Sequence, residues 1–227
     1  MTKTKILLAS ASPRRRQLLG LLNIPFETTK TDLDETPIPG EAAPDLVRRL
    51  SRLKAKAAQA IHTDCVVIAA DTDVELDGEI LGKPMDPEEA RLMLRALRGR
   101  EHRVYGGITI IPPAAEMGER IEHGVETLVT ETRVWMRDYT DAELESYVAT
   151  GDPLDKAAGY AVQHLGFRPV ARVEGCYSNI MGLALCQLWQ SLSQIESMPD
   201  PCLQCHLHPG LDCTVPFLVA EGAVRGS

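Results

Sequence analysis

The chain has few aromatic residues, no long apolar run and no excess of positive charge, and each shortage excludes a class of protein. Aromatic side chains make up 4% of its 227 residues, which suits an aliphatic sheet covered by helices. No apolar stretch reaches the roughly 20 residues needed to cross a bilayer, and the N-terminus lacks a signal-peptide pattern. The formal net charge of −8 argues against general nucleic-acid binding, which requires a basic face. We therefore expect a cytoplasmic protein with no nucleic-acid or membrane partner.

The cysteines are few, and half of them are concentrated in a tail. In a cytoplasmic chain the six cysteines are expected to be thiols or metal ligands rather than disulfides. Three lie in apolar settings and are predicted core thiols: Cys65, Cys176 and Cys186. The others lie beyond Pro199, where periodicity is lost, and could hold zinc with a histidine: Cys202, Cys205 and Cys213. We expect a main domain over 1–198 and a tail over 199–227, which is either disordered or metal-binding; the haem pattern C-x-x-C-H is disfavoured without a signal peptide.

Helix and strand patterns alternate along the main domain, as in an α/β fold. Asp77-Gly78 predicts a tight hairpin turn, Asp86 predicts a helix start, and Thr140 with Glu143 forms a capping box. Gly151 is the expected stop of that last helix. The predicted strands are 5–9, 25–31, 65–71, 74–76, 79–81, 102–111 and 125–136, and the predicted helices are 13–23, 44–60, one from 86, one from 140 and 179–193.

The N-terminal segment has the features of an anion-binding site. The apolar strand 5–9 is followed by Ser10-Ala-Ser-Pro-Arg14-Arg15, in which Ser12 is a capping residue and Pro13 takes the first helical position. Backbone N–H groups, two hydroxyls and guanidinium groups then converge on one small volume, which suits phosphate. The alternative is an ordinary capped surface helix, but basic residues at a helix start want an anion because the macrodipole is positive there.

Three further residues are candidates for this site. Lys54 lies in a basic helical pattern, where the alternative is a solvated face, and Lys83 lies between Gly82 and Pro84 in a stiff loop past the hairpin. Asp71 ends the apolar run from Cys65, and ligands of α/β proteins gather at the carboxyl ends of strands. A carboxylate there can accept a proton from water.

The chain resembles the Maf family of nucleoside triphosphate pyrophosphatases at five segments in the family's order. They are the opening S-A-S-P-R-R, Asp34-Glu35, the R-L-S-R-L-K-A run around Lys54, A-D-T with L-G-K-P around Asp71 and Lys83, and D-K-A-A-G-Y-A-V-Q ending at Gln163. With the opening strand they span residues 5 to about 190. The resemblance implies an elongated mixed β-sheet flanked by helices, in two lobes with the active site in the cleft between them, and a homodimer.

The resemblance also implies roles for individual residues. Asp71 would be the proton acceptor, Glu35 a metal ligand or water-orienting group, and Asp71 and Glu35 together would hold a divalent cation, Mg²⁺, Mn²⁺ or Co²⁺. Asp73 departs from the family, which has an apolar residue there, and either adds a carboxylate to the metal site or faces solvent. The expected phosphate-binding residues are Ser10, Arg14, Arg15, Lys54 and Lys83.

Substrate choice is also implied by the resemblance. The branch of the family acting on dTTP and UTP has Arg, Thr and Gln at three positions, matched here by Arg14, Thr72 and Gln163. A glutamine amide offers both a donor and an acceptor, as the edge of uracil or thymine requires. The sequence therefore predicts hydrolysis of dTTP and UTP to the monophosphate and pyrophosphate. Two alternatives stay open: a regulatory nucleotide-binding protein of cell division, and a pyrophosphatase for purine or 7-methyl-GTP nucleotides.

Overall fold

A computed structural model describes residues 4–116 and 125–195, and its centre is one mixed sheet of seven strands. The order is β2-β1-β3-β5-β6-β7, with β4 paired to β3 off this path. β1 is parallel to β2 and β3, and the other pairings are antiparallel. The strands are β1 Lys5–Ala9, β2 Glu27–Thr29, β3 Cys65–Leu76, β4 Glu79–Leu81, β5 Glu101–Ile111, β6 Glu126–Met136 and β7 Val170–Glu174. The predicted α/β class, with an elongated mixed sheet, is confirmed.

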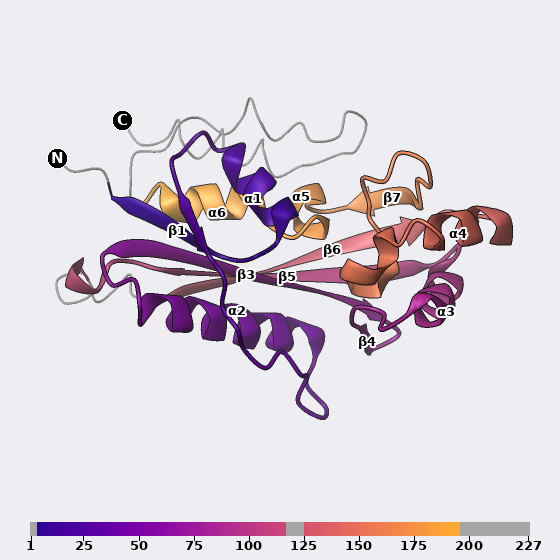
Figure 1. The fold of residues 1–227 in the computed structure, drawn as a ribbon, viewed down its shortest axis with the longest axis horizontal. Coiled ribbons are helices and arrows are strands. Elements are labelled where there is room, and N and C mark those ends of the chain that lie inside the picture. The colour runs from indigo at the N-terminus through magenta and orange to yellow at the C-terminus, as the bar shows by residue number, and fades with distance from the viewer. Residues whose placement is uncertain (1–3, 117–124, 196–227) are drawn as a thin grey trace.

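Helices cover both faces of this sheet (Figure 1). α2 runs along one face, while α1 and α6 lie on the other, and α3 and α4 pack at one end of the long strands. The helices are α1 Pro13–Gly20, α2 Ala43–Gln59, α3 Pro87–Leu97, α4 Asp141–Val148, α5 Tyr177–Ile180 and α6 Leu185–Leu192, with short 3₁₀ turns η1 Ala114–Glu116, η3 Asp152–Asp155 and η4 Ala157–Gly159. Among the described helices, none is long and apolar enough to cross a membrane.

The predicted helix starts are confirmed by their caps. The Ser12 side chain accepts a hydrogen bond from the backbone N–H of Arg15, and Asp86 does the same for Glu89. Thr140 and Glu143 form a complete capping box at α4. Each cap satisfies N–H groups that have no partner within the helix, so these starts are encoded within four residues.

Five predicted elements need correction. Segments 65–71 and 74–76 form the single strand β3, because β5 pairs with it continuously from Val67 to Glu75. The predicted helix 179–193 is broken between α5 and α6, where Gly182 has a φ of +116°. Helix 13–23 ends at Gly20, and strand 25–31 shortens to β2. β7 was not predicted; it lies at the edge of the sheet, where β6 is its one partner among the described strands.

Buried apolar side chains gather at both ends of the sheet. One cluster joins β1, α1 and α6 around Leu8, Leu19 and Leu188. Another joins the far ends of β3 and β5 to α3 and α4 around Leu94 and Tyr147. Two smaller clusters lie beside α2, one around Leu7 and Ala55 and one around Val47 and Tyr105. The two larger clusters thus lie at opposite ends of the sheet, in line with the expected two lobes. Cys65, Cys176 and Cys186 are buried as predicted, whereas the proposed tail zinc residues lie outside the described residues.

Candidate active site

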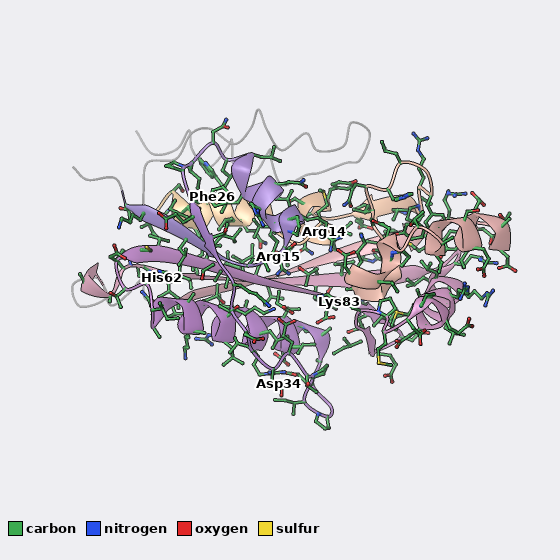
Figure 2. All side chains as sticks on the ribbon, in the orientation of Figure 1. Arg14, Arg15, Phe26, Asp34, His62 and Lys83 are labelled. Carbon is green, nitrogen blue, oxygen red and sulfur yellow. The ribbon has the colours of Figure 1, made fainter. Side chains whose placement is uncertain are left out.

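A cavity of about 630 Å³ lies between the two larger clusters, along an open edge of β3. β1 pairs with β3 only up to Ile68, and β4 pairs with it only from Val74. Among the described strands, residues 69–73 therefore have a partner on one side alone, which is β5. Figure 2 shows Arg14, Arg15 and Lys83 near the middle of the long axis, around this gap. Ligands of α/β proteins commonly bind where neighbouring strands diverge in this way.

Two glycines on β5 let both faces of β3 contribute to the site. Asp71 pairs with Gly107 and Thr72 with Gly106. A Cβ at Gly107 would lie 2.3 Å from the carbonyl oxygen of Val47 on α2, and a Cβ at Gly106 would lie 1.9 Å from Asn179 Oδ1. Because successive side chains of a strand point to opposite faces, Asp71 faces α2, while Thr72 faces the side that holds Arg15.

Lys54 of α2 joins the two proposed catalytic carboxylates. Its Nζ lies 2.6 Å from Asp71 Oδ1 and 2.8 Å from Glu35 Oε1. The Lys54 and Asp71 side chains are 8% and 7% exposed, whereas that of Glu35 is 49% exposed. In this arrangement Lys54 pairs with both carboxylates, and the phosphate-holding role expected from the sequence stays a prediction.

The pKa values of two carboxyl groups on the acidic side of the cavity are shifted in opposite directions. Burial and the neighbouring Asp71 carboxylate raise the pKa of Asp73 to about 7. For Glu35, burial acts to raise the pKa, but the hydrogen bond and charge of Lys54 outweigh it and lower the pKa. Asp73 is half-buried and lines the cavity, so of the two alternatives for this residue the structure favours a place in the site over a solvent-facing one.

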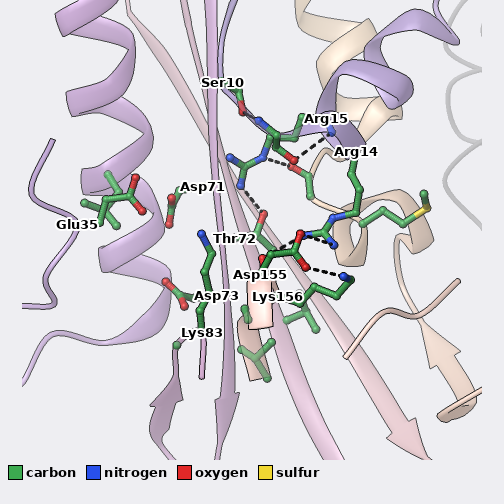
Figure 3. Close-up of a pocket in the computed structure, with 18 of the residues that line it drawn as sticks. Ser10, Arg14, Arg15, Glu35, Asp71, Thr72, Asp73, Lys83, Asp155 and Lys156 are labelled. Atoms are coloured by element: carbon green, nitrogen blue, oxygen red, sulfur yellow. Dashed lines mark hydrogen bonds and ion pairs between the residues drawn. The ribbon is translucent and has the colours of Figure 1, made fainter. Parts of the chain in front are cut away.

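Cationic side chains from other segments also line the cavity (Figure 3). Arg15 donates from Nε to the carbonyl of Gly182 at 2.9 Å and from Nη2 to Thr72 Oγ1 at 3.2 Å. Burial lowers the pKa of its guanidinium, against the charges of Asp71 and Glu35. Lys83 extends into the cavity towards Asp71 from an exposed loop. Negative charge entering here would meet fixed positive charge.

The second lobe, which contains α3, α4 and the segment 152–167, lines another part of the cavity through polar residues. Arg14 Nη1 lies 3.8 Å from Asp155 Oδ2, and Lys156 Nζ lies 2.6 Å from Asp155 Oδ1. The Tyr160 hydroxyl lies 2.7 Å from Nε2 of His102, which is 2% exposed. Burial lowers the pKa of His102 to about 4. Gln163, three residues after Tyr160, is half-buried and lines the same cavity.

All the site residues predicted from the sequence and present in the described part of the chain line this one cavity. They are Ser10, Arg14, Arg15, Glu35, Lys54, Asp71, Thr72, Lys83 and Gln163. One positional argument was wrong: Asp71 lies in the middle of β3 and not at its carboxyl end. It is nevertheless reachable because β1 stops short of it.

Comparison with known proteins places this architecture in a family. The family model described as "Maf-like protein" matches residues 5–195. The chain belongs to the Maf-like family. It is 48% identical over 183 residues to a dTTP/UTP pyrophosphatase of Myxococcus xanthus, covering 81% of this chain and 88% of the relative. It is 43% identical to a dTTP/UTP pyrophosphatase of Caldanaerobacter subterraneus, covering 84% of this chain and 88% of the relative.

Solved structures with a related shape are more distant from this Maf-like chain. A HAM1 protein from Coxiella burnetii aligns with a TM-score of 0.46 and 16% identity, covering 84% of this chain and 99% of the other. The Ham1 protein of Staphylococcus aureus aligns with a TM-score of 0.45 and 16% identity, covering 74% of this chain and 81% of the other.

The donor set of the Maf-like site limits how it could hold a metal ion. Within the described residues, no group of three or more His, Cys, Asp or Glu side chains is arranged to hold one. Glu35 and Asp71 both already contact Lys54. Mg²⁺ is usually bound by one or two carboxylates together with substrate phosphates and water, and not by an all-protein cage. The residues thus fit an ion that enters with a triphosphate.

Sequence reasoning missed three residues of this cavity as parts of the site. Asp155 and Lys156 belong to the D-K-A segment used for the resemblance, and Lys156 is buried, with its Nζ also 2.8 Å from Asp152 Oδ1. Gly182 lines the cavity and bonds Arg15 through its carbonyl. The available signal for Gly182 was a glycine inside an otherwise helical pattern, which often has a packing or functional reason.

Proposed function

We propose that this protein hydrolyses dTTP and UTP between the α- and β-phosphates, giving the nucleoside monophosphate and pyrophosphate. The observation that carries the proposal is the buried Asp71 carboxylate, paired with Lys54 at 2.6 Å in a cavity that Arg15 and Lys83 also line. A base set against cations is what water attack on a polyphosphate requires. The names of the relatives support the substrate.

The chemistry divides between the two sides of the cavity. Asp71 takes a proton from the attacking water, whose oxygen bonds to the α-phosphorus as the bond to the bridging oxygen breaks. Lys54 and Glu35 keep the Asp71 carboxylate aimed into the cavity. Negative charge accumulates on the departing pyrophosphate, where Arg15, Lys83, Ser10 and the N-terminus of α1 would receive it.

A divalent cation, Mg²⁺, Mn²⁺ or Co²⁺, is part of the proposal and would be held by Glu35 and Asp71 together with the substrate phosphates. When bound, such an ion neutralises phosphate charge and makes water easier to deprotonate. The half-buried Asp73 lines the same cavity, and burial together with the Asp71 charge raises its pKa to about 7, so a cation nearby would favour its ionised form.

Recognition of the base is assigned to Gln163. It lies on the second lobe, on the segment that follows Tyr160. Its amide can donate to O4 and accept from N3–H of uracil or thymine at the same time. The proposal extends to a cytoplasmic homodimer, as the resemblance implies, and light scattering on the purified protein measures that assembly directly.

A pyrophosphate-release screen tests the activity. The eight natural nucleoside triphosphates and several modified pyrimidine ones are offered in turn with Mg²⁺, Mn²⁺, Co²⁺ or EDTA. Asp71→Asn, which keeps the side-chain shape but removes the base, is the matched control. We expect dTTP and UTP to have the highest kcat/KM, no turnover in EDTA, and turnover at least about 100-fold lower in the variant. A preference for purine nucleotides, or binding of dTTP without pyrophosphate release in any metal, would contradict the proposal.

A further inference from the structure

Arg15 is held by two elements that are far from it in sequence. Its Nε donates to the carbonyl oxygen of Gly182, 167 residues away, at 2.9 Å, and its Nη2 donates to Thr72 Oγ1, 57 residues away, at 3.2 Å. Both partners line the cavity together with Arg15. The arginine is therefore fixed from the break between α5 and α6 on one side and from β3 on the other.

The backbone at Gly182 is shaped for this contact. Its φ of +116° is one that L-residues rarely adopt, and it interrupts the helical run so that a carbonyl is free to accept from outside. A Cβ there would lie 3.4 Å from both Cγ and Nε of Arg15, and 3.8 Å from Thr72 Oγ1. An alanine would thus bring its Cβ into contact with the arginine at the atom that donates the hydrogen bond, on a backbone conformation that is strained for an L-residue.

We propose that Gly182 and Thr72 are positioning residues that aim Arg15 at the substrate phosphates, a role that rests on the proposed function. An arginine has five N–H donors, and these two contacts use one on Nε and one on Nη2, which leaves two on Nη1 and one on Nη2 facing a ligand. A guanidinium held at both Nε and Nη2 cannot rotate, so its free edge is preorganised for two phosphate oxygens.

This inference gives Thr72 a role different from the base-reading one expected from the sequence. Its hydroxyl accepts a hydrogen bond from Arg15, and its side chain lies on the face of β3 opposite Asp71. A residue acting through Arg15 affects every triphosphate equally, because the phosphates are common to all of them. A residue reading the base changes the ratio between substrates.

The test uses Thr72→Val, Thr72→Ser, Gly182→Ala and Arg15→Ala, alone and combined. We expect Thr72→Val to lower kcat/KM for dTTP, UTP and CTP by one common factor of about ten, the usual loss for one hydrogen bond to a charged group. Thr72→Ser keeps the hydroxyl and should stay close to wild type. Affinity for inorganic tripolyphosphate, measured by calorimetry, should fall in Thr72→Val and Gly182→Ala, but neither change should weaken it further by more than about twofold once Arg15 is alanine.

Backbone strain is separated by a matched glycine. Gly78 in the hairpin turn has a φ of +87° and open space around its Cβ position, so Gly78→Ala introduces the strain without crowding Arg15 and should leave tripolyphosphate affinity unchanged. A shift in the ratio of dTTP to CTP turnover with Thr72→Val, or additive losses in the Arg15→Ala background, would overturn the inference. Failure of the wild type to hydrolyse any nucleotide would instead count against the proposed function, since the tripolyphosphate titrations do not depend on hydrolysis.

Discussion

Replacing Lys54 with methionine separates a lysine that holds phosphate from one that holds the catalytic carboxylates. Methionine fills a similar volume but removes the ammonium group that lies 2.6 Å from Asp71 Oδ1. The Asp71 side chain is only 7% exposed, so its carboxylate would be buried without this partner. Removing one partner of a buried ion pair typically costs about 3–5 kcal/mol. We expect the lower end, about 3 kcal/mol, because Glu35 is half-exposed and the cavity admits water.

A loss of about 3 kcal/mol in the free energy of unfolding corresponds to a large decrease in Tm. A chain of this size loses about 2–4 °C of Tm for each kcal/mol, so Lys54→Met should melt about 6–12 °C below wild type without ligand. Asp71→Asn leaves Lys54 paired with Glu35 at 2.8 Å and should lose only about 2–4 °C. The double variant, which removes both buried charges, should melt above Lys54→Met alone.

Circular dichroism melts of the ligand-free proteins, with tripolyphosphate titrations alongside, measure both effects. Turnover of dTTP should fall at least about 100-fold in Lys54→Met and in Asp71→Asn. If Lys54→Met melts within about 2 °C of wild type while losing tripolyphosphate affinity, Lys54 is a phosphate ligand, as the sequence alone indicated. In that case the ion pair with Asp71 does not hold the base.

Three further outcomes are expected. Lys83→Ala should lower kcat/KM by the equivalent of about 2–4 kcal/mol without lowering the ligand-free Tm, since Lys83 is exposed; a large Tm loss would mean a structural role. Gln163→Glu should weaken dTTP and UTP hydrolysis by about 1–3 kcal/mol while sparing tripolyphosphate binding, and an unchanged ranking of dTTP, UTP, CTP and GTP would remove Gln163 as the base reader. His102 has a folded pKa of about 4 against 6.5, so the unfolded state binds more protons between these values and stability falls as pH is lowered through that window. The loss of stability approaches about 3 kcal/mol near pH 4. In His102→Phe, the free energy of unfolding measured in urea should therefore change less between pH 7 and pH 5 than in wild type. An equal change in both proteins would refute the lowered pKa of His102.

Local sequence determined the features that depend on a few neighbouring residues. The caps at Ser12, Asp86 and Thr140 start their helices as predicted because each side chain bonds a backbone N–H three residues ahead. The hairpin at Asp77-Gly78 joins β3 to β4, as expected for that dipeptide. The motif residues were also identifiable, chiefly because their patterns resemble those of the Maf family.

What the site residues contact was decided only by the tertiary structure. The ion pair of Lys54 could not be predicted, because a helical basic pattern does not reveal that β3 brings Asp71 within 2.6 Å of it. Asp71 was placed at a strand end because nothing local indicates that β5 extends the pairing to Glu75. The break at Gly182 and its hydrogen bond to Arg15, 167 residues away, could not be predicted from hydrophobic periodicity for the same physical reason. Such contacts depend on how distant segments pack, and a short stretch of sequence does not show which residues lie across the cavity from it.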